Sequence, residues 1–178
     1  MTEKSNNPAG KQLESETLYE RQKNLQNQVI GPVVVGAGVT DARNIGKILR
    51  IADALNCREV IFVDTPHADA HRIRKVSRTM SEKRPHRFIS EDEFESEISR
   101  HKPLVAVEIT SNSQDVFTCD LPQNATLVIG NERHGIPESI LQQCEFAVHI
   151  PMFGINSSMN VATSLSIVLY EWYRRFYA

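Results

Sequence analysis

Hydrophobic positions are scarce over the first 28 residues of the chain and become frequent from Val29 onward. From there, short β-branched runs alternate with longer segments in which apolar residues recur every three or four positions. This alternation is typical of βα units whose strands form a parallel sheet. The pattern therefore predicts an α/β domain over residues 29–178, with a mostly parallel sheet and helices on both faces, after a polar N-terminal extension over 1–28 that is flexible or partly helical.

The predicted strands are five short aliphatic or β-branched runs. They cover residues 33–35, 60–63, 104–109, 126–129 and 147–150. Between the first two runs, apolar residues from Ile45 to Leu55 recur at helical spacing, and Asp41 stands where a helix N-cap is expected. Further helices are predicted over residues 68–81, 91–100, 137–143 and 159–177, and one over 14–27 within the extension.

The last predicted helix carries an apolar stripe and ends in an aromatic and basic segment from Trp172 to Tyr177. A stripe of this kind usually packs in the core. So many large rings on one terminal helix also suit an interface between subunits, because aromatic residues are enriched there. The sequence leaves both interpretations open.

Composition excludes several classes of protein. The chain is 40% hydrophobic and 24% charged, and none of its apolar runs approaches the roughly 20 residues that a membrane helix needs. The N-terminal segment has neither the apolar core of a secretory signal nor the character of a transit peptide, so we expect a cytoplasmic protein. The three cysteines, Cys57, Cys119 and Cys144, are far apart in the sequence, and we expect no metal site.

Charge is segregated along the chain although the net charge is only −2. Seven basic residues stand between His71 and Arg87, and an acidic run over 91–97 follows. Clusters of this kind either form a solvated helix face or bind phosphates. The candidate phosphate-binding residues are Arg72, Arg74, Lys75, Arg78, Arg84 and Arg87.

Three loops that follow predicted strands carry unusual residues, and ligands of open α/β sheets bind beyond the carboxyl ends of the strands. The first loop leads from Gly36 into a helix that holds Asn44 and, about 600° further around the axis, Arg50. The second is a charged, glycine-bracketed turn over 130–137, and the third is an apolar loop over 150–162 in which Ser157 or Ser158 is placed to cap the last helix. The sequence therefore predicts one ligand site built from these loops.

A nicotinamide-dependent enzyme is the weaker alternative for this site. Gly36 and Gly38 resemble part of a dinucleotide-binding turn, but a third glycine is missing at the required position, and Asp64 is the sole acidic residue that ends the second strand. The melting temperature would separate the two interpretations, because a cofactor that binds the native state raises it.

The same three loops resemble the three sequence motifs of the SpoU branch of the SPOUT methyltransferases. Residues 44–54 look like the first motif, 130–135 like the second and 150–161 like the third, in the family's order and spacing. Met159 departs from the leucine usual in the family, which is a change of similar volume. The resemblance covers residues 33 to about 170 and implies a C-terminal trefoil knot, an exception to the rule that chains do not thread through loops.

The resemblance also implies a cofactor, S-adenosyl-L-methionine, bound by the second and third motif loops and by the loop after the middle strand. The positions that match are Gly130, Ile150, Met152, Ser158 and Met159, with Glu108 or Thr110 as a further contact. It implies a homodimer as well, since the family pairs its subunits across the knot.

By the same resemblance, the reaction is methylation of an RNA ribose 2'-hydroxyl, with Arg50 in the main role and Asn44, Glu132 and Asn160 as positioning residues. A guanidinium keeps its proton, with a pKa above about 12, so Arg50 is a poor general base. We expect Arg50 to grip the phosphate beside the target ribose and to stabilise the developing alkoxide, while water or that phosphate accepts the proton.

A protein that keeps this fold but binds RNA without turnover is the alternative from another class. The presence of all four residues named for the reaction argues against it. The sequence does not name the RNA. Because the chain shows no separate RNA-binding domain, we expect tRNA rather than rRNA as the substrate.

Overall fold

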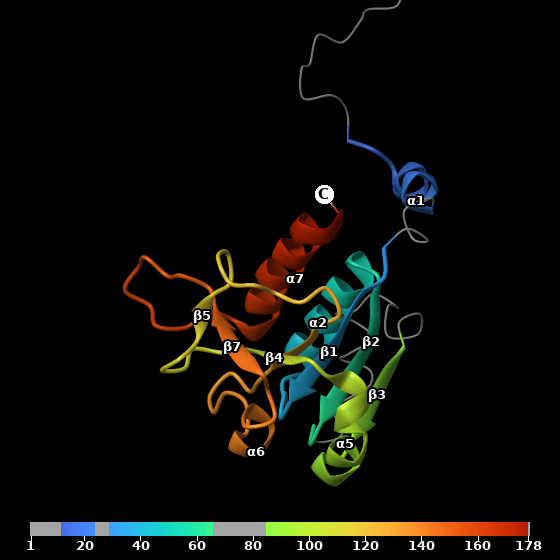
Figure 1. Ribbon diagram of the computed structural model, residues 1–178. Helices are drawn as coiled ribbons and strands as arrows, with labels where there is room; N and C mark the ends of the chain where they lie inside the picture. Colours follow the sequence, from blue (N-terminus) through green and yellow to red (C-terminus); the bar gives the residue numbers. More distant parts are fainter. Residues whose placement is uncertain (1–11, 24–28, 66–84, 178) are drawn as a thin grey trace, which may run out of the picture.

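Seven strands form a single parallel sheet in the computed structural model, which describes residues 12–23, 29–65 and 85–177 (Figure 1). The strands are β1 Gly31–Ala37, β2 Cys57–Val63, β3 His86–Ile89, β4 Leu104–Val107, β5 Gln114–Asp115, β6 Thr126–Ile129 and β7 Phe146–His149. Their order across the sheet is β3-β2-β1-β6-β4-β7-β5, and every pairing is parallel. The predicted fold class is confirmed.

The helices within the described residues are α1 Ser15–Lys23, α2 Ala42–Ala54, α5 Glu91–Glu97, α6 Glu138–Leu141 and α7 Val161–Tyr177, with a 3₁₀ turn, η1, over Ile98–His101. The α-helices fall where helices were predicted, and η1 extends one residue beyond the helix predicted over 91–100. The helix expected over 68–81 lies outside the described residues. Two strands were not predicted: β3 is half exposed and basic, and β5 has two residues, so neither has the apolar run that marks a buried strand.

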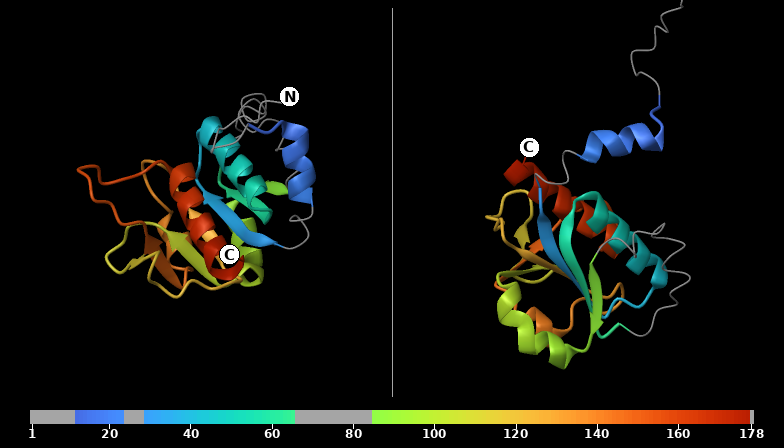
Figure 2. Two further views of the ribbon diagram at one scale, coloured as in Figure 1. Left: turned by 90° about the horizontal axis from the view of Figure 1, so that it is seen from above. Right: turned by 90° about the vertical axis from the view of Figure 1, so that its right-hand side faces the viewer.

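The helices cover both faces of the sheet, as Figure 2 shows in its right-hand view. On one face, α2 and α7 pack side by side, with Ile48 and Leu165 buried in the same cluster as Val34 and Leu127 of the strands. On the other face, Phe94 of α5 and Ile140 of α6 are buried against Val35 and Val128. The central strands β1, β2, β6, β4 and β7 therefore send alternate side chains to two different cores.

Buried hydrogen bonds and ion pairs anchor α7 to the loop before β6. The indole of Trp172 is buried and donates to the carbonyl of Gln123 at 3.0 Å. Glu171, which is 6% exposed, accepts from Arg174 and Arg175, and Arg175 also donates to the carbonyl of Val116 at 2.6 Å. Among the rings at the end of α7, Trp172 is part of the core, and Tyr173, Phe176 and Tyr177 are partly buried against it.

Glu171→Gln is expected to lower stability at neutral pH. Hydrogen bonds from Arg174 and Arg175 lower the pKa of Glu171 to about 2 from its ordinary 4.5. A carboxyl whose pKa is depressed in the folded state stabilises the fold above its unfolded pKa and loses that contribution as the pH falls through its folded pKa. In urea titrations, wild type should exceed the variant in stability at pH 7 and the gap should close from about pH 4.5 toward 2. A gap that is constant with pH would contradict this account.

None of the helices in the described part of the chain is long and apolar enough to cross a membrane. Cys57 and Cys119 are buried, and Cys144 is half-buried. Burial raises the pKa of the Cys144 thiol to about 12, so this group is protonated at neutral pH and is a weak nucleophile.

Candidate active site

The carboxyl ends of β1, β6, β4 and β7 are neighbours in the sheet, and the three motif loops leave the sheet at these ends. The loop after β1 reaches α2 through Asp41, whose side chain accepts from the amide of Arg43 at 2.8 Å and caps the helix as predicted. Hydrogen bonds from Arg43 lower the pKa of Asp41, which keeps this cap ionised. The cap fixes the first turn of α2, where Asn44 lies.

Asn44 connects all three motif loops. It is 6% exposed, and its amide nitrogen donates to Glu132 of the second loop. Its amide oxygen accepts from the amide of Asn160 in the third loop at 3.1 Å. The structure therefore brings together three of the four residues expected at the reaction centre, and a buried amide whose two ends are both used holds them.

Asn160 has a second function, which the sequence did not predict. Its side-chain oxygen accepts from the amide of Thr163 at 3.4 Å, and its carbonyl accepts from the amide of Ser164 at 2.9 Å. Asn160 thus caps α7, and the serines expected in that position, Ser157 and Ser158, precede the helix by two residues or more. The residue that ties the third loop to Asn44 is also the residue that begins α7.

Arg50 lies apart from this junction. It is exposed on α2, and in the described part of the chain it has no hydrogen bond or ion pair. It lines a groove of about 270 Å³ between α2 and α7, together with Lys47, Ile51, Ala162, Thr163 and Ser166. The turn of about 600° from Asn44 accounts for this separation. The pairing of Arg50 with Asp53 or Glu132, the alternative to a functional role, is not found.

A cavity of about 240 Å³ opens beside the junction, and we call it the carboxyl-edge pocket. Six of the residues expected to bind a cofactor line it: Glu108, Gly130, Ile150, Met152, Ser158 and Met159. Glu132 lines it too, so the junction and the pocket share a wall. Apolar walls with a few polar groups are typical of pockets for small organic ligands.

Thr110 does not line the pocket, and Ile109 does. The reason is that β4 ends at Val107, two residues earlier than expected, and the chain then turns. The turn is closed by Ser113, whose hydroxyl accepts from the amide of Thr110 at 3.1 Å. Of the two residues expected as a further contact, Glu108 lines the pocket and Thr110 does not.

The second motif loop is a tight turn held by backbone groups. Asn131 and Gly135 exchange two backbone hydrogen bonds of 2.9 Å, and Gly135 has a φ of +69°, which glycine adopts without strain. A Cβ at Gly135 would lie 2.8 Å from the carboxylate of Glu108, and one at Gly130 would lie 2.2 Å from the backbone of Gly135. Both glycines are thus required for the loop to close over the pocket.

Asn131 and His149 are functional candidates that the sequence did not reveal. The side chain of Asn131 accepts from the amide of Arg133 at 2.8 Å and donates to the carbonyl of Gly38 at 2.8 Å, so it joins the loops after β6 and β1. An Asn that comes after a strand and one glycine, with a second glycine four residues later, is the signal that could have indicated such a turn.

His149 ends β7 and lines the carboxyl-edge pocket, with Nδ1 3.1 Å from the hydroxyl of Ser113. That hydroxyl donates its single proton to the carbonyl of Thr110 at 3.0 Å. This contact joins the end of β7 to the turn after β4, which the same hydroxyl closes.

Most of the basic segment lies outside the described residues, including Arg72, Arg74, Lys75, Arg78 and Arg84. Arg87 is described, on β3. Its guanidinium is 2.7 Å from Glu59 and 2.7 Å from Glu97, and it lowers the pKa of Glu97. These two ion pairs join β3 to β2 and to α5, and they already use the guanidinium of Arg87. Arg87 is therefore a poor candidate for a phosphate contact. No cluster of three or more metal-ligating side chains is found among the described residues.

Three relatives illustrate what the chain is similar to. The 23S rRNA (guanosine-2'-O-)-methyltransferase RlmB of Neisseria meningitidis is 32% identical over 140 residues, which are 78% of this chain and 56% of that protein. The SpoU methyltransferase AviRb of Streptomyces viridochromogenes, solved in complex with the cofactor AdoMet, matches with a TM-score of 0.68 and 30% identity over 80% of this chain and 59% of its own. The A. aeolicus TrmH/SpoU tRNA modifying enzyme matches with a TM-score of 0.73 and 22% identity, over 89% of this chain and 84% of its own, and shows the fold.

The chain spans 56% to 63% of the first four full-length bacterial relatives that it matches. The family model of the SpoU rRNA Methylase family matches residues 31–170, which include every strand of the sheet and all three motif loops. With more than half of its length matched, the chain belongs to the SpoU rRNA Methylase family.

Proposed function

We propose that the chain is an RNA methyltransferase that uses S-adenosyl-L-methionine to methylate a ribose 2'-hydroxyl of tRNA or rRNA in the cytoplasm. The observation that carries the proposal is the junction of Asn44, Glu132 and Asn160 at the wall of the carboxyl-edge pocket. The printed names of its relatives support it, since RlmB methylates guanosine ribose in 23S rRNA and AviRb was solved with AdoMet.

The residues that line the carboxyl-edge pocket support the proposed cofactor. Gly130 and Gly135 allow the tight turn of the second motif loop. A Cβ at Gly130 would meet the backbone of Gly135, and a Cβ at Gly135 would meet the carboxylate of Glu108. Ile129, Ile150 and Met152 supply apolar walls for a planar ring, and Glu108 supplies an acceptor for a cationic or hydroxyl group. We propose that these residues hold the cofactor, which when bound supplies an electrophilic methyl group, and that the C-terminal region forms the family's knot.

Protein groups would contribute mainly alignment and charge. Methyl transfer requires the nucleophile, methyl and leaving group to lie in line, and holding them so removes much of the barrier. The bridge from Asn44 fixes Glu132 and Asn160 beside the pocket, where they can hold the ribose. Arg50, which has no partner among the described residues, is available for the adjacent phosphate and for the developing alkoxide.

The test is methylation of unmodified bulk tRNA and rRNA by the purified chain with a methyl-labelled cofactor. We expect label in ribose, in nucleotide linkages that resist alkaline cleavage. Cofactor binding by calorimetry without any methyl transfer to either RNA would instead favour the non-catalytic RNA-binding protein. Binding of neither RNA nor cofactor would refute both.

We further propose that the chain is a homodimer. Large apolar side chains are exposed on the third motif loop, namely Phe153, Ile155 and Met159, and two more, Phe117 and Tyr170, line an open cavity beside α7. Phe153 and Ile155 are almost fully exposed, at 98% and 103%, and apolar surface of this extent usually marks an interface. A second copy of the chain is the occupant that the family resemblance implies.

Light scattering at micromolar concentration should therefore give twice the chain mass of 20.1 kDa. Ile155→Glu should shift the protein toward monomer, because a carboxylate is costly to bury at an interface. Ile30→Glu is the matched control. Ile30 is also exposed, at 56%, but it directly precedes the amino end of β1, at the edge of the sheet opposite the motif loops. A monomeric wild type, or equal shifts in both variants, would count against this dimer.

A further inference from the structure

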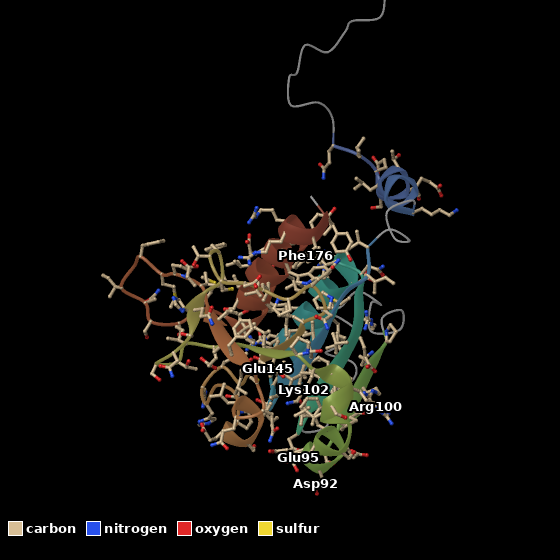
Figure 3. All side chains as sticks on the ribbon, in the orientation of Figure 1. Asp92, Glu95, Arg100, Lys102, Glu145 and Phe176 are labelled. Atoms are coloured by element: carbon tan, nitrogen blue, oxygen red, sulfur yellow. The ribbon has the colours of Figure 1, made fainter. Side chains whose placement is uncertain are left out.

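A second polar cavity lies at the opposite edge of the sheet, and we call it the amino-edge pocket. It has a volume of about 210 Å³ and is formed where β1, β2 and β6 begin and η1 ends. Four of its lining residues are basic or can become so: Arg58, Arg100, His101 and Lys102. Amide side chains of Gln123 and Asn124 line it as well, and none of the lining residues is an Asp or Glu. Figure 3 labels Arg100, Lys102 and the nearby Glu145.

The arginines of this pocket differ from most others in the described part of the chain. Arg43, Arg87, Arg174 and Arg175 each pair with a carboxylate. Four described arginines do not, namely Arg50, Arg58, Arg100 and Arg133. Arg133 lines the carboxyl-edge pocket, Arg50 lines the groove between α2 and α7, and the other two both line the amino-edge pocket. The amino-edge pocket therefore holds two guanidinium groups that have no carboxylate partner among the described residues.

Nearby carboxylates do not neutralise the cluster. Glu145 is 3.7 Å from the ammonium of Lys102, which is a long contact between two exposed groups and is weak in water. Glu97 is 3.7 Å from Nε2 of His101, but its carboxylate already accepts from Arg87 at 2.7 Å. Two guanidinium groups and one ammonium around a small cavity repel one another unless an anion lies between them. Guanidinium groups match the oxygens of a phosphate in particular.

The pocket is well separated from the carboxyl-edge pocket. Thr126, the first residue of β6, lines the amino-edge pocket, and Gly130, just after the last residue of β6, lines the other. Four residues of strand span roughly 13 Å. A mononucleotide bound in one pocket does not fill the other. A polynucleotide has many phosphates and can contact both edges of the sheet at once.

We propose that the amino-edge pocket binds a backbone phosphate of the RNA substrate, at a distance from the nucleotide that is methylated. This inference rests on the proposed function, because that function supplies the polynucleotide. Arg58 and Arg100 grip the phosphate, and Lys102 adds charge. Contacts of this kind set the position of an RNA without reading its sequence. The pocket thus accounts for RNA affinity in a chain whose net charge is −2.

The experiment measures binding of unmodified bulk tRNA over a series of salt concentrations, with the full chain and with the triple variant Arg58→Ala, Arg100→Ala, Lys102→Ala. Each lost phosphate contact should lower the slope of log affinity against log salt by roughly 0.7 to 0.9, so the variant, which loses one phosphate, should lose about one unit. Its affinity should fall by about tenfold or more. Cofactor affinity should not change, because the carboxyl-edge pocket shares no residue with this one.

Arg100→Ala and Arg43→Ala form a matched pair. Each removes one exposed positive charge, but Arg43 lies outside the pocket and already pairs with Asp41 at 2.7 Å. Only Arg100→Ala should weaken RNA binding. Equal losses in the pair would assign the effect to net charge and overturn the proposal.

Two further outcomes would overturn it. One is an unchanged salt slope in the triple variant. The other is loss of inorganic phosphate binding with undiminished RNA affinity, since the cavity would then serve a free anion. If the wild-type chain methylates RNA while either result is found, the further inference fails alone. If the wild-type chain neither binds nor methylates RNA, the proposed function fails with it.

Discussion

Arg50→Ala is expected to lower the single-turnover rate of RNA methylation by about 10²- to 10³-fold, which is typical for the loss of one preorganised donor to developing charge. Arg50 is exposed in a groove outside the carboxyl-edge pocket, so the role proposed for it involves contacts to RNA and not to the cofactor. Cofactor affinity, measured by calorimetry, should therefore stay nearly the same. An effect on rate without an effect on cofactor binding indicates an interaction made in the transition state.

Lys47→Ala is the matched control, because Lys47 is an exposed cation in the same groove, one turn earlier on α2. Lys47→Ala should lower the single-turnover rate of methylation far less than Arg50→Ala does. Arg50→Lys should restore little of the rate, since an ammonium lacks the planar fork that grips a phosphate. A fully active Arg50→Ala variant would remove the residue from the mechanism, and equal losses in cofactor binding would contradict the role given to it.

The parts of the fold that local pattern controls could be predicted from the sequence. The strands with continuous apolar runs, such as β2 and β6, were predicted because burial on both faces requires such runs. α2 was predicted with its cap at Asp41, since the apolar spacing and the capping side chain are both local signals. β3 escaped prediction because it is an edge strand with exposed, basic positions, and β5 because two residues form no pattern.

The sequence indicated which residues belong to the site, but it did not indicate how they contact one another. The motif resemblance named Asn44, Glu132 and Asn160, which the structure joins, but Asn44 is separated from Asn160 by 116 residues and no periodicity encodes that contact. Thr110, which the resemblance offered as an alternative to Glu108, does not line the pocket, because β4 ends at Val107 and the chain then turns. The amino-edge pocket draws on β1, β2, β6 and η1, so only the folded sheet brings its cations together.

Gly130→Ala should weaken cofactor binding by about tenfold or more through distortion of the second motif loop. The added Cβ would lie 2.2 Å from the carbonyl carbon of Gly135 and 2.3 Å from the nitrogen of Ile136. Both are backbone atoms, so no side chain can rotate away and the turn itself must open. Overpacking of this kind costs about 1–3 kcal/mol, so the variant should also melt at a lower temperature than wild type.

Gly154→Ala provides the matched control for this effect. Gly154 lies in the third motif loop, yet a Cβ there would meet nothing within 4 Å, and its φ is not in the left-handed region. The same methyl group should therefore leave both cofactor affinity and melting temperature unchanged. Calorimetry and thermal unfolding of the two variants test the pair together. If Gly130→Ala binds the cofactor as tightly as Gly154→Ala does, then the turn over residues 130–136 is not a wall of the cofactor site, and the assignment of the carboxyl-edge pocket to the cofactor is wrong.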